Sequence, residues 1–331
     1  MSNSKTNWGA EDREILLRQH KKTEDSYKLQ LEQKEKSLLA LQDQLAQVRS
    51  ARFNKLTPAS PVTRKQGDIV RFIFSDLHGS LMHKPSIASL LGDIAAMDPD
   101  EIYLNGDIVE CGGFLAQHHT LGYVAQTEYT YEDDIAQGNH FLDQLRAAAP
   151  HAKIEYLEGN HEKRVETWCV DQAVSNSRDA EFLRRNNAPE FLLGLASRGI
   201  SYYRMSKMYD GLTVPGTIKR GKVYITHGFS TAKDAVGATL ARIAGNVVFG
   251  HTHRHQSTLS HLTAVGTVGS WNPGCLCEMQ PLYLHTNPSS WTRGYSIQFV
   301  RKSGDFLHCN IPIINGESLL VPLLNNQSSE K

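Results

Sequence analysis

Hydrophobic residues follow a seven-residue spacing near the start of the chain. No proline or glycine occurs between Glu11 and Ser50, a stretch rich in Glu, Gln, Lys, Arg and Leu, which predicts one long helix. Its apolar seam consists of Leu17, Tyr27, Leu31, Leu38, Leu41, Leu45 and Val48. This spacing indicates a coiled coil, and hence a homo-oligomer formed through the helix. His20, Glu24 and Lys34 interrupt the seam, so a helix lying on the main domain is the alternative.

From residue 68 onward, short apolar runs alternate with helical spacings. The runs cover residues 69–74, 101–104, 154–157, 223–226 and 246–249, and helices are expected near 86–96, 132–149, 180–185 and 190–196. Nearly continuous apolar runs are typical of strands that are buried on both faces. Residues 200–204, 262–268, 295–300 and 305–314 predict further strands, the last three antiparallel. The pattern indicates an α/β domain over residues 68–324.

Polar side chains follow five of the predicted strands at the point where each strand ends. They are Asp76 and His78, then Asp107, then Asn160 and His161, then His227, and finally His251 and His253. Because open α/β sheets gather their sites at the carboxyl ends of the strands, we expect these side chains to lie close together. A second Gly-Asn-His sequence at residues 138–140 has helical neighbours, and no role is predicted for it.

The segments at the two ends of this domain are polar. Residues 1–50 hold the predicted helix, residues 51–67 form a linker, and residues 325–331 form a tail. The linker contains Pro58 and Pro61 and several basic side chains, which would suit either contact with phosphates or a plain solvated connection.

Composition narrows the classes of function. Lys+Arg and Asp+Glu both number 35, so no overall charge draws the chain to nucleic acid or to a membrane surface. No apolar run approaches the roughly 20 residues of a membrane helix, and the first residues lack the features of a signal peptide. The five cysteines are odd in number and scattered, which is typical of a reduced compartment. A cytoplasmic location without membrane contact is therefore expected.

The polar strand ends together supply two carboxylates, one amide and four imidazoles, setting His161 aside. Burying such groups without partners is costly, and metal binding would satisfy them. Oxygen and nitrogen donors without thiolate favour manganese, with iron, zinc or nickel as alternatives. The donors exceed what one ion can take, so two divalent ions are predicted. Paired ions are suited to in-line displacement at phosphorus, which indicates phosphoester hydrolysis.

The strand ends read Asp-Leu-His, Gly-Asp, Gly-Asn-His-Glu, His-Gly and Gly-His-Thr-His in this order. Over roughly residues 68–314 this series resembles the calcineurin-like metallophosphoesterase superfamily, and the overall look is similar to uncharacterised members carried by bacteriophages and bacteria. The resemblance implies a four-layer α/β/β/α sandwich with a dimetal site. It implies Asp76, His78 and His253 as ligands of one metal, Asn160, His227 and His251 as ligands of the other, and Asp107 as the bridging carboxylate.

The resemblance also implies roles for the residues that do not bind metal. His161 would protonate or stabilise the leaving oxygen, and Glu162 would orient the His161 imidazole. A hydroxide bridging the two metals would attack phosphorus in line.

Differences from other branches of the superfamily bear on the substrate. Protein phosphatases continue the second block with Asp-Arg-Gly, whose arginine clamps phosphate, whereas Glu110, Cys111 and Gly112 stand here. Lys163 and Arg164 are candidates to replace that clamp.

The sequence offers one further substrate candidate and leaves three functions open. Between residues 112 and 133, an aromatic tract that contains His118 and His119 would suit a nucleotide, with an ordinary surface loop as the alternative. A phosphodiesterase or nuclease acting on nucleotides or nucleic acid is therefore favoured. The alternatives are a phosphomonoesterase acting on a phosphoprotein or small metabolite, and an assembly or adaptor protein with a vestigial site.

Overall fold

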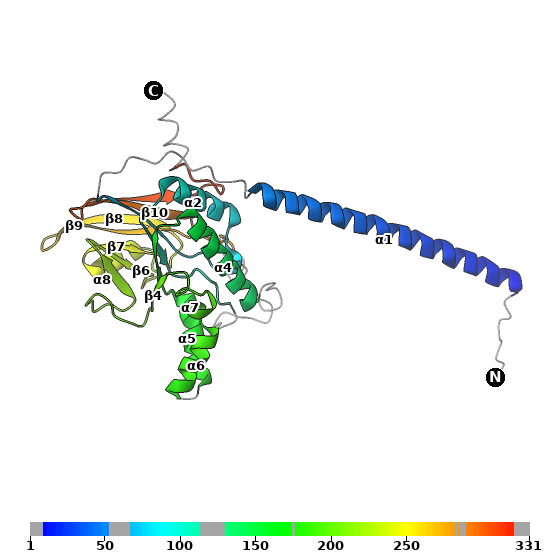
Figure 1. Ribbon diagram of the computed structural model, residues 1–331, viewed down its shortest axis with the longest axis horizontal. Helices are drawn as coiled ribbons and strands as arrows, with labels where there is room; N and C mark the ends of the chain where they lie inside the picture. Colours follow the sequence, from blue (N-terminus) through cyan, green and yellow to red (C-terminus); the bar gives the residue numbers. More distant parts are fainter. Residues whose placement is uncertain are drawn as a thin grey trace, which may run out of the picture. The chain divides into compact units, whose positions relative to one another are not determined.

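The structure is a computed structural model that describes residues 9–52, 67–112, 130–173, 176–281, 284 and 289–320 (Figure 1). The chain divides into two compact units, Met1–Thr57 and Pro58–Lys331. The first unit contains the long helix α1 (Ala10–Arg52), which confirms the predicted N-terminal helix. Most of the expected linker, all of the tail, and the loop with His118 and His119 lie outside the described residues.

The first sheet of the second unit has six strands in the order β11-β10-β1-β2-β3-β4. Four of them run parallel: β1 (Ile69–Phe74), β2 (Glu101–Asn105), β3 (Lys153–Leu157) and β4 (Ser201–Tyr203). Two antiparallel strands, β10 (Gly294–Val300) and β11 (Phe306–Pro312), extend the β1 edge. The apolar run of β1 lies inside this sheet, as its continuous hydrophobicity predicts.

The second sheet has five strands in the order β5-β6-β7-β9-β8. They are β5 (Thr217–Arg220), β6 (Val223–Thr226), β7 (Asn246–Phe249), β8 (His255–Leu262) and β9 (Gly266–Pro273). β6, β7 and β9 run parallel, and β5 and β8 are antiparallel to their neighbours. The single strand expected over residues 262–268 is wrong, because this segment contains the end of β8, the turn at residues 263–265 and the start of β9.

Alternate side chains of the first sheet face two different layers. Phe72 and Phe74 of β1 pack toward the helices α2 (Lys84–Met97) and α4 (Tyr131–Ala148). Ile73, between them, packs instead against residues of the second sheet such as Val248. Helix α8 (Ala235–Ile243) lies on the second sheet, with Ala235 against Phe249. The four-layer α/β/β/α sandwich is thus confirmed (Figure 1).

Three further helices lie in the insertion between β3 and β4. They are α5 (Asn160–Gln172), α6 (Ser177–Asn187) and α7 (Pro189–Leu192). Figure 1 shows α5 and α6 side by side, directed away from the sheets. The residue 138–140 sequence lies inside α4, as its helical spacing predicts. No described helix has the length and apolar character required to cross a membrane.

A buried charge network joins the two sheets near the amino ends of the strands. Arg220 of β5 forms an ion pair of 2.7 Å with the buried Glu155 of β3. Arg71 of β1 pairs with Glu101 of β2 and also donates a 3.2 Å hydrogen bond to the Arg220 carbonyl. Removing one partner of a buried pair leaves the other desolvated and unpaired, so this network is a sensitive part of the sandwich.

We expect Arg220→Met to lower the free energy of unfolding by about 3 kcal/mol, because Glu155 would keep only peripheral partners. Urea denaturation measures this loss. The double variant Arg220→Met/Glu155→Leu, which removes both charges, should recover most of it. A loss below about 1 kcal/mol in the single variant would show that the pair is not a stabilising link.

Candidate metal centre

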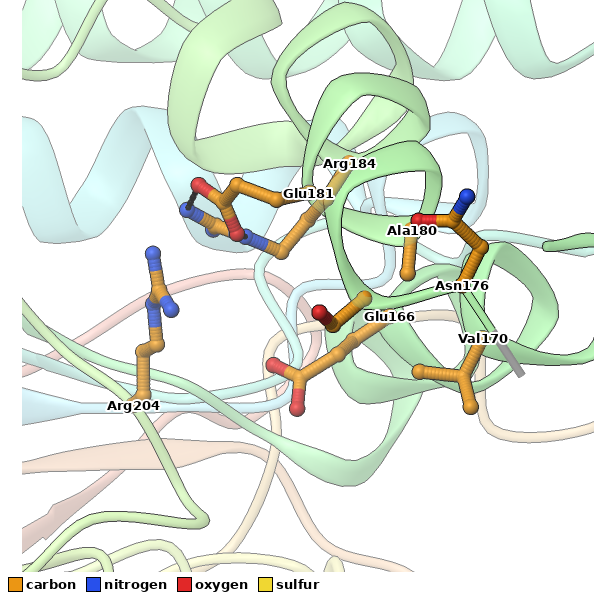
Figure 2. A pocket seen from close by; sticks show the side chains of 8 residues that line it. Glu166, Val170, Asn176, Ala180, Glu181, Arg184 and Arg204 are labelled. Atoms are coloured by element: carbon orange, nitrogen blue, oxygen red, sulfur yellow. Dashed lines mark hydrogen bonds and ion pairs between the residues drawn. The ribbon is translucent and has the colours of Figure 1, made fainter.

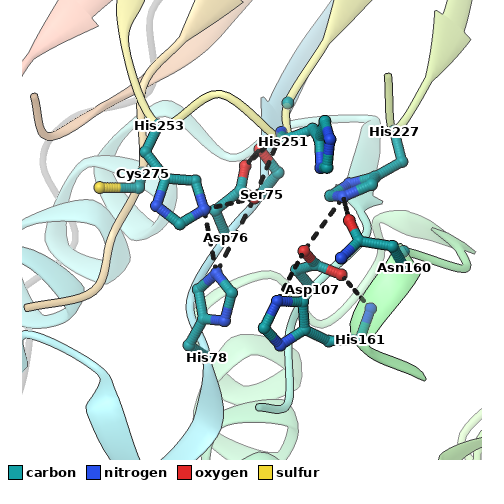
Figure 3. Close-up of polar contacts among 12 residues, drawn as sticks. Ser75, Asp76, His78, Asp107, Asn160, His161, His227, His251, His253 and Cys275 are labelled. Atoms are coloured by element: carbon teal, nitrogen blue, oxygen red, sulfur yellow. Dashed lines mark hydrogen bonds and ion pairs between the residues drawn. The ribbon is translucent and has the colours of Figure 1, made fainter. Parts of the chain in front are cut away.

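Loops from both sheets converge at the carboxyl ends of their parallel strands. The seven sequence-predicted ligands all lie at this edge: Asp76 and His78 follow β1, Asp107 follows β2, Asn160 begins α5, His227 follows β6, and His251 and His253 follow β7 (Figure 3). Five of the seven are buried, and Asn160 and His251 are partly exposed. The structure therefore brings together residues separated by up to 177 positions in the chain.

One group of donors surrounds Asp76. Asp76, His78 and Asp107 can each offer a ligand atom within 4.8 Å of the others. The Nε2 atom of His253 lies 3.0 Å from Asp76 Oδ1 and 3.1 Å from His78 Nε2. Two imidazole nitrogens directed at one carboxylate match the donor geometry of a cation site better than that of a closed hydrogen-bond network.

A second group of donors surrounds the other side of Asp107. Asp107, His227 and His251 also have ligand atoms within 4.8 Å of one another. His227 Nε2 lies 3.1 Å from Asp107 Oδ2 and 3.0 Å from Asn160 Oδ1. Asp107 belongs to both groups, so one carboxylate lies between two sets of donors. The residues present therefore fit two cations that share a ligand.

The backbone at these positions adopts a conformation that is unfavourable for most residues. Positive φ angles occur at Asp76 (59°), His78 (56°), Asp107 (53°), His251 (70°) and His253 (57°). Such left-handed conformations cost about 1–2 kcal/mol each outside glycine. Hydrogen bonds between the loops hold them, including those from the backbone N–H of Leu77 and His78 to the Asp107 carbonyl. The left-handed conformation turns the side chains toward one another directly after each strand ends.

Glycines in the motifs allow the loops to approach closely. A Cβ atom at Gly159 would collide with the carboxylate and backbone nitrogen of Asp107. One at Gly250 would collide with the side chains of Ser75 and Asp76. These two glycines are therefore needed for space beside the carboxylates.

Burial and the charges of neighbouring residues shift the pKa values of the carboxylates and imidazoles in the cluster. Burial opposes ionisation of Asp76, but His253 and His227 outweigh it and lower the pKa of Asp76 to about 2. Burial likewise opposes protonation of His227, yet Asp107 raises the pKa of His227 to about 10. For His251, burial and the neighbouring His227 both act against the charged form and lower the pKa to about 4. The carboxylates are thus anionic and available as ligands at neutral pH.

His161 lies beside the donors at the amino end of α5. Its Nδ1 atom is 2.8 Å from the Glu110 carbonyl and 3.1 Å from the Glu110 carboxylate. Its Nε2 atom is 3.8 Å from Asp107 Oδ2. Burial would lower the pKa of His161, but Asp107 and Glu110 raise it to about 9. The imidazole therefore carries a proton at neutral pH and is held by Nδ1, which leaves Nε2 facing the centre.

The predicted function of Glu162 as the partner of the His161 imidazole is wrong. The carboxylate of Glu162 accepts hydrogen bonds from four backbone N–H groups, those of Asp107, Ile108, Val109 and Gly159, and from the Tyr156 hydroxyl. Within the described residues, none of its hydrogen bonds is with the imidazole. Glu162 caps the amino end of α5 and fixes the loop that carries Asp107, because a buried carboxylate takes the N–H donors that the loop leaves unpaired.

Glu110 is the residue that sequence reasoning missed. Its buried carboxylate contacts the Nδ1 atoms of both His78 and His161. Burial opposes ionisation of Glu110, but the two histidines outweigh this effect and hold the pKa of Glu110 well below its usual range. The sequence places this carboxylate three residues after Asp107 and could have indicated its role. In the sequence, Glu110 is singled out only because it stands where protein phosphatases have the segment with the clamping arginine.

Of the four substrate-binding residues predicted from the sequence, the structure describes Arg164 and Lys163. Arg164 is one helical turn beyond His161, and its Nη2 atom lies 3.0 Å from His161 Nε2. Lys163 is half-buried. Burial raises the pKa of the nearby Glu158 to about 7, and the charge of Lys163 opposes part of that rise. Trp291 also contributes an aromatic ring, whose centroid is 4.0 Å from that of His253. His118 and His119 lie outside the described residues.

A separate cavity of about 320 Å³ lies between α5 and α6 (Figure 2). Its lining includes Glu166, Arg184 and Arg204 but none of the seven candidate ligands. Arg184 is already paired with Glu181 at 3.0 Å and with Glu190 at 2.6 Å. Arg184 is thus neutralised by carboxylates of its own helix and of α7, whereas the buried Glu166 Oε2 in this lining has no hydrogen-bond partner within the described part of the chain.

Comparisons with solved structures gave distant matches. Vps29 from Entamoeba histolytica, as a single mutant, is 12% identical, with 76% of this chain and 96% of that chain covered and a TM-score of 0.35. Vacuolar protein sorting 29 from Cryptosporidium parvum is 10% identical, with 76% and 95% covered and a TM-score of 0.38. A conserved predicted phosphoesterase from Streptococcus pneumoniae is 12% identical, with 74% and 99% covered and a TM-score of 0.27. With TM-scores this low, no conclusion is drawn from these matches.

Comparison with curated protein sequences gave no match. The model of the calcineurin-like phosphoesterase family matches residues 71–255, which is more than half of the chain. The matched range contains all seven candidate ligands together with Glu110, His161 and Glu162. The chain belongs to the calcineurin-like phosphoesterase family.

Proposed function

We propose that the protein is a phosphoester hydrolase that uses two divalent metal ions, with manganese as the favoured metal. The observation that carries the proposal is the position of Asp107 in both donor groups. Asp76, His78 and His253 would hold one ion, and Asn160, His227 and His251 the other. When bound, paired ions lower the pKa of water and neutralise charge on phosphate oxygens.

The proton for the leaving oxygen would come from His161. Its Nδ1–H donates to Glu110, which fixes the ring and stabilises the protonated form. Nε2 can then transfer its proton as the ester bond breaks. The guanidinium of Arg164, whose Nη2 lies 3.0 Å from that nitrogen, cannot hydrogen-bond a protonated Nε2 and would turn to a phosphate oxygen beside it.

We favour a phosphodiester, in a nucleotide or nucleic acid, as the substrate. A monoester carries about one more negative charge than a diester at neutral pH. Asp76, Asp107 and Glu110 put three buried carboxylates at the centre, while the described residues supply Arg164 as the arginine in contact with His161. Two bound cations would outweigh these carboxylates, so the preference rests on the contacts to phosphate: residues 110–112 supply no clamping arginine, which suits the less anionic substrate. The cytoplasmic location remains a prediction.

The substrate class can be tested with metal-stripped protein reloaded with Mn²⁺. We expect kcat/KM for bis-p-nitrophenyl phosphate to exceed that for p-nitrophenyl phosphate by roughly tenfold, and labelled single-stranded DNA to be cleaved. The opposite preference would replace the proposal with a phosphomonoesterase acting on a phosphoprotein or metabolite. Absence of turnover with every ester in the presence of bound metal would indicate an adaptor with a vestigial site.

Replacing the shared carboxylate should affect both ions at once. We expect Asp107→Ala to reduce the metal content from two ions per chain to less than one, as measured by mass spectrometry of the desalted protein. The matched control is Asp143→Asn, because Asp143 is an exposed carboxylate paired with Arg198. Full retention of both ions in Asp107→Ala would contradict the shared-ligand assignment.

His161→Ala should separate catalysis from metal binding. We expect kcat to fall by roughly 10²- to 10⁴-fold while both ions stay bound, because His161 is assigned as a proton donor rather than a ligand. Metal analysis and kinetics on the same preparation check this. Loss of an ion would mean that the imidazole is a ligand after all.

Glu110 and Glu162 should differ in what their loss changes. Glu110→Gln removes a charge that raises the pKa of His161, so the alkaline limb of the kcat profile should move to lower pH. Glu162→Gln leaves backbone N–H groups facing an amide, so it should lower the free energy of unfolding by about 2 kcal/mol without moving that limb. A shift in the second variant and none in the first would restore Glu162 as the partner of His161.

A further inference from the structure

The helix α1 carries an exposed apolar row. Leu17, Tyr27, Leu31, Leu38 and Leu41 lie along it, with side chains between 57% and 70% exposed. Together with His20, Glu24 and Lys34 they occupy positions alternately three and four residues apart, which places them on one stripe of the helix. Helices in water gain most of their stability by packing such a stripe against a partner. The row therefore marks an interaction surface, and the polar residues that lie in the same stripe show which partner fits it.

Three polar residues, His20, Glu24 and Lys34, stand in the same stripe. In a parallel pair of identical helices, each stripe residue faces its own copy. Glu24 would then meet the partner's Glu24, and Lys34 would meet the partner's Lys34. Both are like-charge contacts inside a packed seam, which are destabilising. A parallel homodimer is therefore disfavoured by the charges of the stripe.

An antiparallel pair removes both conflicts. When the two helices cross symmetrically about Leu29, Glu24 faces the partner's Lys34 and Lys34 faces the partner's Glu24. In the same register Leu17 faces the partner's Leu41, and Tyr27 faces the partner's Leu31. The remaining layer sets His20 against the partner's Leu38. The stripe between residues 17 and 41 is thus complementary to its own reverse in apolar contacts and in charge.

Side chains beside the stripe are compatible with this register. Lys21 lies next to the partner's Glu35, an opposite-charge contact. Lys28 approaches the partner's Lys28 at the midpoint, but Lys28 is paired with Glu24 of its own helix at 3.0 Å. That exposed pair is worth little on its own, so Glu24 can contact Lys28 and the partner's Lys34 together.

We propose that α1 is an antiparallel dimerisation helix that binds α1 of a second copy of this chain, with the register centred on Leu29. The proposal is independent of the phosphoesterase activity and of metal binding. It commits to a dimer in solution and to specific neighbours across the interface, and both can be tested with the full-length chain.

Disulfide cross-linking tests the direction of the helices. Leu17→Cys and Leu41→Cys are prepared separately in a Cys309→Ala background, since the other four native cysteines are buried. In the proposed register Leu17 and the partner's Leu17 lie about 36 Å apart, far beyond disulfide reach. We expect cross-linked dimer when the two variants are mixed and oxidised, and none from either variant alone. Cross-linking of each variant with itself would show a parallel pair and overturn the proposal.

Charge exchange tests the register. Sedimentation should show a dimer for the native chain, and Glu24→Lys should weaken it by at least about tenfold, because two like-charge contacts form. The double variant Glu24→Lys/Lys34→Glu should restore the native affinity within about threefold. Glu32→Lys, with the same charge change beside the stripe, is the matched control. A monomer, a larger oligomer, or a dimer unaffected by Glu24→Lys would each overturn the proposal.

Discussion

The burial of one carboxylate, Asp107, between two sets of imidazoles is the constraint on which this centre depends. Asp107 is 1% exposed, its carbonyl receives N–H groups from the loop after β1, and its own N–H donates to Glu162 of α5. Its carboxylate accepts a 2.9 Å hydrogen bond from the backbone N–H of His161 and lies beside His227 from the second sheet. Moving this side chain would therefore disturb loops from both sheets. The strands of the sandwich hold the loops in place, and the contacts of the buried Asp107 carboxylate link the loops to one another.

The centre combines strain and buried charge that would destabilise an ordinary loop. Five of its residues adopt left-handed conformations, and its carboxylates and all its imidazoles except that of His251 are buried. Such features persist only where surrounding packing over-determines them. Here the packing comes from rigid strands, from close approach at Gly159 and Gly250, and from the Glu162 carboxylate that satisfies four N–H groups. The same features hold the donors apart from water before any ligand arrives.

Much of this arrangement could be predicted from the sequence. Continuous apolar runs identified β1, β2, β3, β6 and β7, and the polar residue after each identified the edge where they meet. The direction of a side chain within the edge could not be predicted in the same way. Glu162 is adjacent to His161 in sequence, but helical geometry turns it toward the Asp107 loop. Glu110 lies in the loop after β2 and reaches the imidazole only because the loops fold together.

The β8–β9 hairpin was another element that the hydrophobic pattern did not predict correctly. Strand β8 alternates exposed and part-buried residues, so its apolar positions did not mark where one strand ended. For α1 the sequence predicted the helix and its seam, and the charges within that seam carry the information about orientation. The proposed pairing of two chains and the proposed catalysis at the strand ends thus rest on separate parts of the sequence.

Asp107 is proposed to be shared by two metal ions. Electron paramagnetic resonance of the protein loaded with two equivalents of Mn²⁺ tests it most directly, because ions bridged by a common ligand are magnetically coupled. We predict the multiline spectrum of a coupled manganese pair, which Asp107→Ala should abolish. A spectrum of isolated, uncoupled Mn²⁺ in the native protein would contradict the account.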